Sequence, residues 1–418
     1  MLVETSSAVD SPARVTVDET RLRVLSLSLV YPNPREPGLG LFVRERLRHL
    51  NRTAQVKVIA PVAVTDYTAR RLRMFSPGFA YQRDGELEVF HPGWAFPPGG
   101  TPANVVCLLA RIFPIIARIR REFPFQVIDA HFGYPEGVVA AYLAKIFGCP
   151  FTMTLRGSEP MFARYPSRRR CLGWALHKAS AVMTVSGNLH KFAIELGARP
   201  SKLFTIPNGA DKDTYHLRDT AVVRRKYGIP AGVRAIVCAG ELIEAKGHHL
   251  VVQAVSELNR EGANIQLIIA GGIARGGRPF EKELRQMISE RALNPYVRLL
   301  GWLPPDELSE LMSAADVFCL ASYTEGWPNV VNEALACGTP VVASDVGAVR
   351  EMILGPEFGY VVPARNQSAV THALKTALSQ PWNRTAIAAW GQSRSWDQVA
   401  QEVFEVLQRV VGEAHVRN

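Results

Sequence analysis

Two glutamates, Glu325 and Glu333, stand between two short apolar segments of the chain. Segments 315–320 and 340–344 are typical of buried strands, and residues 329–337 favour a helix between them. Glu325 is therefore expected in a loop at the carboxyl end of a strand, and Glu333 one turn into the helix. Ligands of an open α/β sheet bind beyond those strand ends, where a helix start offers N–H groups to a phosphate. By itself, the spacing also fits two solvated surface charges.

Three basic side chains hold similar places elsewhere. His131 and Arg156 each follow a strand-like apolar segment directly, and Lys246 follows another by a short loop. A lysine beyond a strand end could stabilise charge on a phosphate, and a histidine at a strand end could have a functional role. From residue type alone, a solvated lysine and a structural histidine remain open.

The first strand-like segment, 23–30, runs into a loop rich in proline and glycine, 31–40, and then into an expected helix. Glycines let the backbone approach an anion closely, so this unit fits a phosphate cradle, and it also fits a plain turn. Asp211 and Asp213 have the spacing of a carboxylate pair that can hold a divalent metal. The preceding Pro207-Asn208-Gly209 favours a turn instead, so no metal site is predicted.

Strand-like and helical segments alternate along the chain, which indicates parallel sheets covered by helices. Strands are expected at 23–30, 56–61, 127–130, 151–155, 181–185, 203–207, 235–240, 265–270, 297–301, 315–320 and 340–344. Residues 70–98 have no regular pattern, and residues 104–122 and 382–411 are expected to be helical. A new cycle of strands begins after residue 230, so a boundary is expected near residues 210–220. The predicted organisation is a disordered leader at 1–20, domains at 21–212 and 213–385, and a C-terminal helix at 386–418.

The composition is that of a globular chain of 418 residues, 47% hydrophobic, with a net charge of +10. The basic balance comes without a nucleic-acid-binding motif, so we expect phosphorylated ligands or an anionic lipid surface and no nucleic acid. Six scattered cysteines without a C-x-x-C pair indicate a reduced cytoplasmic compartment. Residues 1–20 lack the apolar core of a signal peptide, and no apolar run has the length of a membrane-spanning helix.

The second glutamate continues into Ala334, Gly338 and Pro340-Val341-Val342. A Glu, seven residues, a second Glu and an Ala-x-x-x-Gly-x-Pro-Val-Val segment form the signature of the family 4 glycosyltransferases, which the chain resembles along nearly its whole length. The resemblance implies the GT-B fold, α/β with two facing Rossmann-like domains, parallel sheets and a last helix that crosses back to the first domain. It also implies a retaining transferase, with the nucleotide-sugar donor in the second domain and the acceptor mainly in the first.

The same resemblance implies roles residue by residue. Glu333 would accept hydrogen bonds from the ribose hydroxyls, Glu325 would hold the hydroxyls of the transferred sugar, and Lys246 would neutralise the leaving diphosphate. His131 would approach the sugar and the acceptor. The leaving phosphate oxygen would take the acceptor proton, so no protein base, metal or other cofactor is expected. The further donor-binding positions are Gly40, Arg156, Leu303, Pro328, Asn329 and Val330.

One position departs from the family: Glu241 stands where an arginine usually precedes the lysine. Arg156 is the first candidate to supply the missing cation. Two alternatives to a transferase therefore stay open. One is a non-catalytic nucleotide-sugar-binding subunit of a polysaccharide synthesis complex; the other is a nucleotide-sugar epimerase on the same fold. A phosphorylase would need a pyridoxal lysine site and a far longer chain.

The Pro-Asn-Pro loop with residues 42–46, the Arg156-Gly157-Ser158 segment and the Glu-Gly-Trp-Pro-Asn run resemble bacterial polysaccharide transferases of the teichuronic-acid type. That resemblance implies a UDP- or GDP-linked hexose donor and a polysaccharide or lipid-linked oligosaccharide acceptor. The arginines of the expected helix 104–122 fit an ordinary surface helix, and they also fit a basic face on anionic lipid. A cytoplasmic protein is expected, with a peripheral position on the inner face of the cell membrane as an open possibility.

Overall fold

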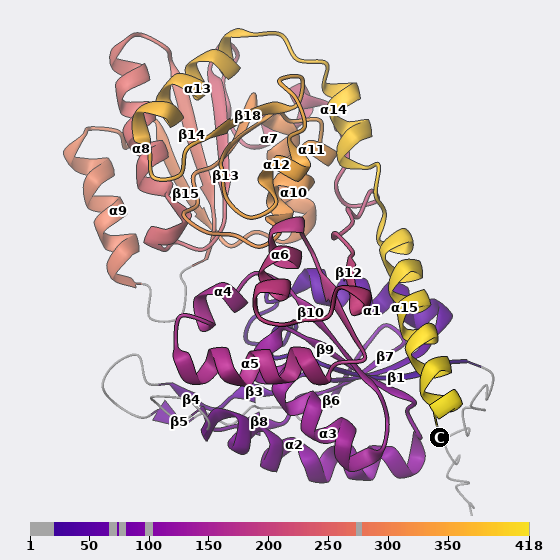
Figure 1. Cartoon of the computed structure of the whole chain (residues 1–418). Helices are drawn as coiled ribbons and strands as arrows, with labels where there is room; N and C mark the ends of the chain where they lie inside the picture. The colour runs from indigo at the N-terminus through magenta and orange to yellow at the C-terminus, as the bar shows by residue number, and fades with distance from the viewer. Residues whose placement is uncertain (1–20, 67–72, 75–80, 97–102, 273–277, 418) are drawn as a thin grey trace, which may run out of the picture.

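The computed structural model describes residues 21–66, 73–74, 81–96, 103–272 and 278–417. Figure 1 shows two α/β domains, one above the other, with the yellow C-terminal helix running back along the first domain. The predicted GT-B architecture is confirmed. The expected leader at 1–20 and the first part of the segment 70–98 fall largely outside the described residues.

An eight-stranded sheet organises the first domain, in the order β12-β11-β10-β9-β1-β2-β7-β6. Neighbouring strands are parallel except β6 and β7. Its strands are β1 (Arg23–Leu27), β2 (Gln55–Ile59), β6 (Tyr81–Asp84), β7 (Leu87–Phe90), β9 (Val127–His131), β10 (Phe151–Leu155), β11 (Ala181–Thr184) and β12 (Leu203–Thr205). Two small pairs lie beside it: β3 (Val62–Ala63) with β8 (Gly93–Trp94), and β4 (Thr65–Asp66) with β5 (Arg73–Met74).

Helices cover both faces of this sheet, because its central strands are apolar on both sides. One face packs on α2 (Ala103–Glu122), α3 (Val138–Phe147) and α5 (Pro166–Lys178), through residues such as Leu108, Val139 and Leu172. The other face packs on α1 (Leu41–Thr53) and the returning α15 (Trp396–Arg417), through Leu47 and Val403. The remaining helices of this domain are α4 (Glu159–Phe162), α6 (Gly187–Glu195) and the turns η1 (Gly133–Gly137) and η2 (Pro200–Lys202).

The second domain is built on a six-stranded parallel sheet in the order β15-β14-β13-β16-β17-β18. Its strands are β13 (Arg234–Ala239), β14 (Ile265–Ala270), β15 (Val297–Gly301), β16 (Val317–Leu320), β17 (Val341–Ser344) and β18 (Gly359–Val362). One face packs on α7 (Thr220–Lys226), α10 (Pro305–Ala314), α11 (Asn329–Ala336), α12 (Val349–Met352) and α14 (Arg384–Gly391). The other packs on α8 (His248–Arg260), α9 (Arg278–Glu290) and α13 (Gln367–Ser379), and the turn η3 (Glu244–Lys246) precedes α8.

Three features differ from the sequence-based prediction. Residues 81–94, expected to be irregular, contain the β6–β7 hairpin and β8. A sixth strand, β18, extends the second sheet beyond the five predicted strands. The tail 382–411, expected to be one helix, is two helices separated by residues 392–395. The chain crosses between the domains at this break.

The two crossings between the domains lie side by side. The backbone N–H of Ala210 donates to the carbonyl of Arg394 at 2.9 Å, and Ala210 forms an isolated parallel bridge with Ser395. The Arg394 side chain also donates to the Pro207 carbonyl at 3.0 Å. These contacts tie both connecting segments into one joint beside the cleft. None of the helices in the described ranges combines the length and apolarity that crossing a membrane requires.

Candidate active site

Each sheet reverses its strand order once, and these two points face each other across the domain boundary. The reversal lies between β1 and β9 in the first sheet and between β13 and β16 in the second. Crevices at such points are the preferred ligand sites of open α/β sheets. Gly40 lies in the loop after β1 and His131 is the last residue of β9, whereas Lys246 and Glu325 lie in the loops after β13 and β16. The fold therefore gathers residues that are far apart in the sequence.

Lys246 and Glu325 form an ion pair at the reversal point of the second sheet. Lys246 Nζ lies 2.6 Å from Glu325 Oε1, and both side chains are only partly exposed. Gly247 has a φ of 67°, and an added Cβ there would lie 2.0 Å from the Ala321 carbonyl oxygen. The loop after β13 thus packs directly on the end of β16, which places the ammonium beside the carboxylate. A cation held this way can stabilise charge that develops on a leaving phosphate.

Glu333 lies one turn into α11, as the helix prediction placed it. Burial raises the pKa of this carboxyl from 4.5 to about 7, although a hydrogen bond from the Tyr215 hydroxyl lowers it in part. The Glu333 carboxylate is half-buried, and its two oxygens can accept further hydrogen bonds from ligand hydroxyls besides the one from Tyr215. The remaining predicted positions on this helix, Pro328, Asn329 and Val330, form its first turn.

The first-domain wall contains a buried polar cluster. His131 is fully buried, and its Nδ1 lies 2.8 Å from Nη2 of Arg156. An arginine only donates, so Nδ1 is the acceptor and the proton sits on Nε2, which is 3.4 Å from Asp129 Oδ2. Burial, and then the positive charge of Arg156, lower the pKa of His131 to about 3. The imidazole is neutral, and Arg156 lies between it and the second domain.

Arg46 completes this cluster from α1. Its guanidinium donates to Asp129 at 3.2 Å and to Thr154 at 2.8 Å, and its side chain is buried. Burial would raise the pKa of Asp129, but Arg46 first, then His131 and Thr152, lower it to about 2. Asp129 therefore stays ionised and holds both neighbours in place. The sequence analysis did not single out Arg46 or Asp129.

Asn208 connects this wall to the donor-side helix. Its Oδ1 lies 3.4 Å from Arg156 Nη1, and its Nδ2 donates to Asn329 Oδ1 at 3.0 Å. Asn208 is buried in the first crossing segment and Asn329 opens α11. The Asn208 side chain therefore bridges the two domains. It connects Arg156 with Asn329, two residues that the sequence analysis predicted to bind the donor.

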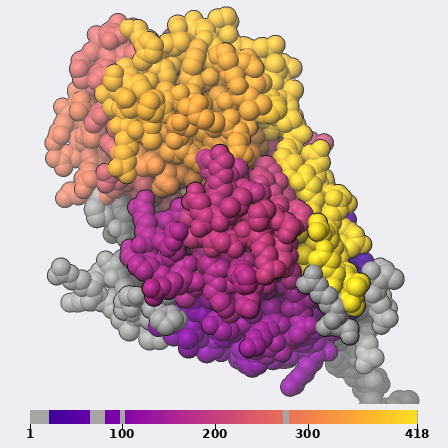
Figure 2. Space-filling view, viewed as in Figure 1, coloured from indigo at the N-terminus to yellow at the C-terminus, as the bar shows by residue number. Residues whose placement is uncertain are grey.

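The two domains also meet backbone to backbone. A Cβ added at Gly326 would lie 2.0 Å from the Arg156 carbonyl oxygen and 2.6 Å from the Gly157 Cα. A second close approach joins Gly38, in the Pro/Gly-rich loop, to the indole of Trp302, 2.3 Å from an added Cβ. The space-filling view shows the domains in contact along this boundary (Figure 2). At Gly326 the neighbouring atoms are backbone, so a larger residue would push the two domains apart at this contact.

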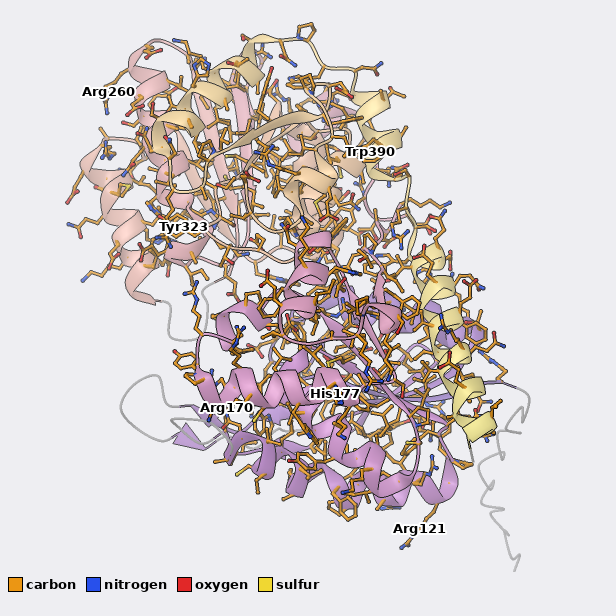
Figure 3. All side chains as sticks on the ribbon, viewed as in Figure 1. Arg121, Arg170, His177, Arg260, Tyr323 and Trp390 are labelled. Carbon is orange, nitrogen blue, oxygen red and sulfur yellow. The ribbon has the colours of Figure 1, made fainter. Side chains whose placement is uncertain are left out.

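The other predicted positions have more local surroundings. Gly40 begins α1 with a φ of 68°, and an added Cβ would lie 2.4 Å from the Val30 carbonyl oxygen. Leu303 is half-buried beside Trp302 and packs on the second-domain core. Glu241 is exposed, and its backbone carbonyl faces His248 Nε2 at 3.2 Å. Tyr323, labelled in Figure 3, lies on the cleft side of the second domain and bonds His249 at 2.8 Å.

The Asp211–Asp213 pair forms a turn. Asp211 Oδ1 accepts the backbone N–H of Asp213 at 3.0 Å and that of Thr214 at 3.3 Å. Both bonds are those of the turn predicted there. Within the described ranges, no group of three or more His, Cys, Asp or Glu side chains is arranged to hold a metal ion.

Two family descriptions match the chain, one for each domain. Residues 37–209 match the glycosyl transferase 4-like domain, and residues 219–394 match glycosyl transferases group 1. The D-inositol 3-phosphate glycosyltransferase of Acidothermus cellulolyticus is 30% identical over 90% of this chain and 86% of its own length. TuaC of Bacillus subtilis, assigned to teichuronic acid biosynthesis as a glycosyltransferase, is 25% identical over 93% of this chain and 94% of its length. The alignment with the D-inositol 3-phosphate glycosyltransferase of Kineococcus radiotolerans, 31% identical, spans 51% of this chain and about half, 53%, of that relative.

The solved structure of Anabaena HepE in complex with UDP and glucose has a similar fold, with a TM-score of 0.71. It is 20% identical and covers 93% of this chain and all of its own. Fold, relatives and family descriptions together define a glycosyltransferase. The chain belongs to the family 4 glycosyltransferases of the GT-B fold.

Proposed function

We propose that this glycosyltransferase moves a hexose from a UDP- or GDP-linked donor to a polysaccharide or lipid-linked oligosaccharide acceptor, with retention at the anomeric carbon. The observation that carries the proposal is the Lys246–Glu325 pair at 2.6 Å, at the reversal point of the second sheet. The relation to TuaC supports a polysaccharide acceptor, and the UDP and glucose bound by HepE support a nucleotide-sugar donor. Other relatives are named for D-inositol 3-phosphate and not for a polysaccharide.

The proposed chemistry assigns one task to each side chain. Lys246 stabilises the diphosphate as the bond between the anomeric carbon and the phosphate oxygen breaks. Glu325 and Glu333 accept hydrogen bonds from sugar and ribose hydroxyls, and the first turn of α11 faces the phosphate. The acceptor oxygen bonds to the anomeric carbon from the face that the phosphate leaves, and its proton passes to the leaving phosphate oxygen. No protein base, metal or other cofactor takes part in this proposal.

The buried imidazole of His131 has a positioning role in the present conformation. Its ring is covered by Arg156, so Arg156 is the first-domain group nearer the second domain. We propose that Arg156 supplies the cation that the family's usual arginine would supply at Glu241. The protein is proposed to act in the cytoplasm, beside the membrane that carries a lipid-linked acceptor.

The proposal is tested with a panel of UDP-, GDP- and ADP-sugars, by thermal shift and by donor hydrolysis, with Glu333→Ala beside the wild type. One nucleotide should stabilise the wild type, and Glu333→Ala should weaken its affinity roughly 10- to 100-fold, because hydrogen bonds to a charged acceptor are lost. Hydrolysis of the same nucleotide sugar should accompany the shift. A panel that leaves the melting temperature of the wild type unchanged would contradict a donor site in this pocket.

Glu241 favours one competing function, a non-catalytic nucleotide-sugar-binding subunit. An exposed carboxylate stands where a diphosphate-binding cation is usual, which would disfavour catalysis more than binding. Stabilisation by a nucleotide sugar, with neither hydrolysis nor transfer to any saccharide, would support that function. Conversion of the sugar to an epimer with no acceptor present would support the epimerase instead.

A further inference from the structure

The outer side of the first-domain helix layer presents large apolar side chains to solvent. Met161 and Tyr165, at α4 and before α5, are 52% and 56% exposed, and Trp174 on α5 is 37% exposed. On the neighbouring α3, Tyr142 and Ile146 are 43% and 54% exposed. The Tyr142 and Trp174 rings lie 4.8 Å apart, so the two helices share one surface. These five residues are called the apolar patch.

Exposed basic side chains frame the apolar patch, and acidic ones are nearly absent from it. In the described stretch 103–195 the exposed acidic residues are Glu122 and Glu195, because Asp129, Glu136 and Glu159 are buried. The basic residues that frame the patch, called the basic rim, are Arg164, Arg169, Arg170, Lys145 and Lys178. Figure 3 shows Arg170 and His177 along α5, on the front of the first domain.

The aromatic side chains of this surface are partly fixed. The Arg168 guanidinium lies 4.7 Å from the Tyr165 ring centre and 5.5 Å from that of Phe162. These contacts hold Tyr165 outward and place a further positive charge beneath it. Tyrosine and tryptophan rings flanked by arginines suit the headgroup level of a bilayer, where one end of the ring is apolar and the other is wet.

The apolar patch begins at the mouth of the cleft. α4 starts at Glu159, which accepts the backbone N–H groups of Arg156 and Gly157, at 3.1 and 2.8 Å to Oε2. Gly157 is the residue that contacts Gly326 of the second domain. Figure 1 accordingly shows α4 between α5 and the second domain. A surface that touched lipid here would bring the bilayer to the acceptor side of the site.

We propose that the apolar patch and the basic rim bind an anionic lipid surface, so that a lipid-linked acceptor enters the cleft beside α4. Only the account of the acceptor rests on the proposed function; the lipid contact rests on the surface itself. Charge complementarity decides the occupant, because basic residues that outnumber the exposed acidic ones attract anionic headgroups while the apolar side chains enter the boundary of the acyl chains. The surface lies on α3, α4 and α5, away from the arginine face of 104–122 considered from sequence.

The test is co-sedimentation of the full chain with vesicles of equal parts phosphatidylcholine and phosphatidylglycerol, and with pure phosphatidylcholine vesicles. We expect binding to the anionic vesicles alone. Arg169→Glu with Arg170→Glu should lower the partition coefficient roughly 30-fold or more. Each basic residue near an anionic surface strengthens binding roughly fivefold, and the two effects multiply. Met161→Ser with Tyr165→Ser should also lower it.

The matched control is Arg225→Glu with Lys282→Glu, which makes the same change in net charge at two exposed positions of the second domain. This control should bind anionic vesicles like the wild type. The proposal would be overturned if the wild type did not bind anionic vesicles, or if both charge-reversed proteins lost vesicle binding to the same extent. Self-association without lipid that the Met161→Ser, Tyr165→Ser protein loses would also overturn it, because a second copy would then cover the surface.

Donor hydrolysis in lipid-free solution separates this proposal from the proposed function. The Arg169→Glu, Arg170→Glu protein should hydrolyse the donor like the wild type. If the wild type neither hydrolyses a nucleotide sugar nor transfers its sugar to a saccharide, and still binds anionic vesicles through the patch, the proposed transfer fails and the lipid surface stands.

Discussion

The residue whose titration matters most for donor binding is Glu333. Burial raises the pKa of this carboxyl to about 7, so the fraction that is ionised falls as the pH drops through neutrality. The ionised form accepts hydrogen bonds from both ribose hydroxyls, whereas the protonated form turns one oxygen into a donor. We therefore expect the donor KM to rise as the pH is lowered below about 7, approaching tenfold per pH unit.

Glu333→Gln is the control for this profile. The amide is an isostere with no titration in this range, so its donor KM should be higher than the wild-type value at alkaline pH and flat with pH. The measurement is donor KM between mildly acidic and mildly alkaline pH for both proteins. An identical slope in the amide variant would assign the pH dependence to another group.

Residue types and spacing predicted the second-domain half of the site better than the first. Glu325 and Glu333 belong to one continuous stretch, and Lys246 follows a strand whose place in the sheet is set by the alternating pattern. The Arg46–Asp129 pair joins α1 to β9, and no local pattern marks that two such distant residues meet. Gly38 was also missed as a contact residue, because its constraint is the Trp302 indole of the other domain.

Among the elements, the apolar strands were predictable, including the edge strands β12 and β15, whereas the edge strands β6 and β18 were missed. The β6–β7 hairpin carries polar, partly exposed residues, yet Asp84-Gly85 at its turn is a hairpin signal, and Gly85 has a φ of 62°. The break before α15 also had a local signal. The Ser395 side chain accepts the Gln398 N–H at 3.2 Å, and the Gln398 side chain accepts the Ser395 N–H at 2.8 Å, which is a capping box. β18 has only four residues, and so short an apolar run does not distinguish a strand from a buried piece of helix.

The element that should couple the two halves of the site is the first crossing segment, through Asn208. Asn208→Ala removes the hydrogen bond to Asn329 at the start of α11 and leaves that buried end of the helix less fixed. We expect the donor KM to rise by roughly five- to tenfold, in line with about 1 kcal/mol for one hydrogen bond. Steady-state kinetics and thermal unfolding measure the two effects together.

Asn188→Ala is the matched control for Asn208→Ala. Asn188 also bridges the domains, donating to the Gly347 carbonyl at 2.7 Å, but from an exposed position on α6. Exposed hydrogen bonds exchange readily with water, so its loss should leave the donor KM nearly unchanged. Equal effects of the two substitutions would show that general domain contact, and not the link to α11, sets donor affinity.

At the scale of the whole molecule, function requires the two domains to close on a cleft that glycine backbones line. Donor and acceptor are proposed to bind to different domains, so transfer needs an approach that excludes water and aligns the reacting atoms. Gly157 and Gly326 set how close that approach becomes, because each would drive a Cβ into the backbone of the other domain. The joint formed by residues 207–210 and 393–396 connects the two chain segments that cross between the domains.

Gly326→Ala should therefore reduce sugar transfer at least tenfold while each domain stays folded, because a methyl group would lie 2.0 Å from the Arg156 carbonyl oxygen. Gly157→Ala should act alike from the first domain, although the donor is proposed to bind to the second. In that variant nucleotide affinity, measured by thermal shift, should hold while transfer falls.

Gly412→Ala in α15 is the control, because an added Cβ there meets nothing within 4 Å, and it should keep full activity with a stability gain of about 0.5–1 kcal/mol. Undiminished transfer by both Gly157→Ala and Gly326→Ala would mean that the closed arrangement is not the one in which the sugar moves.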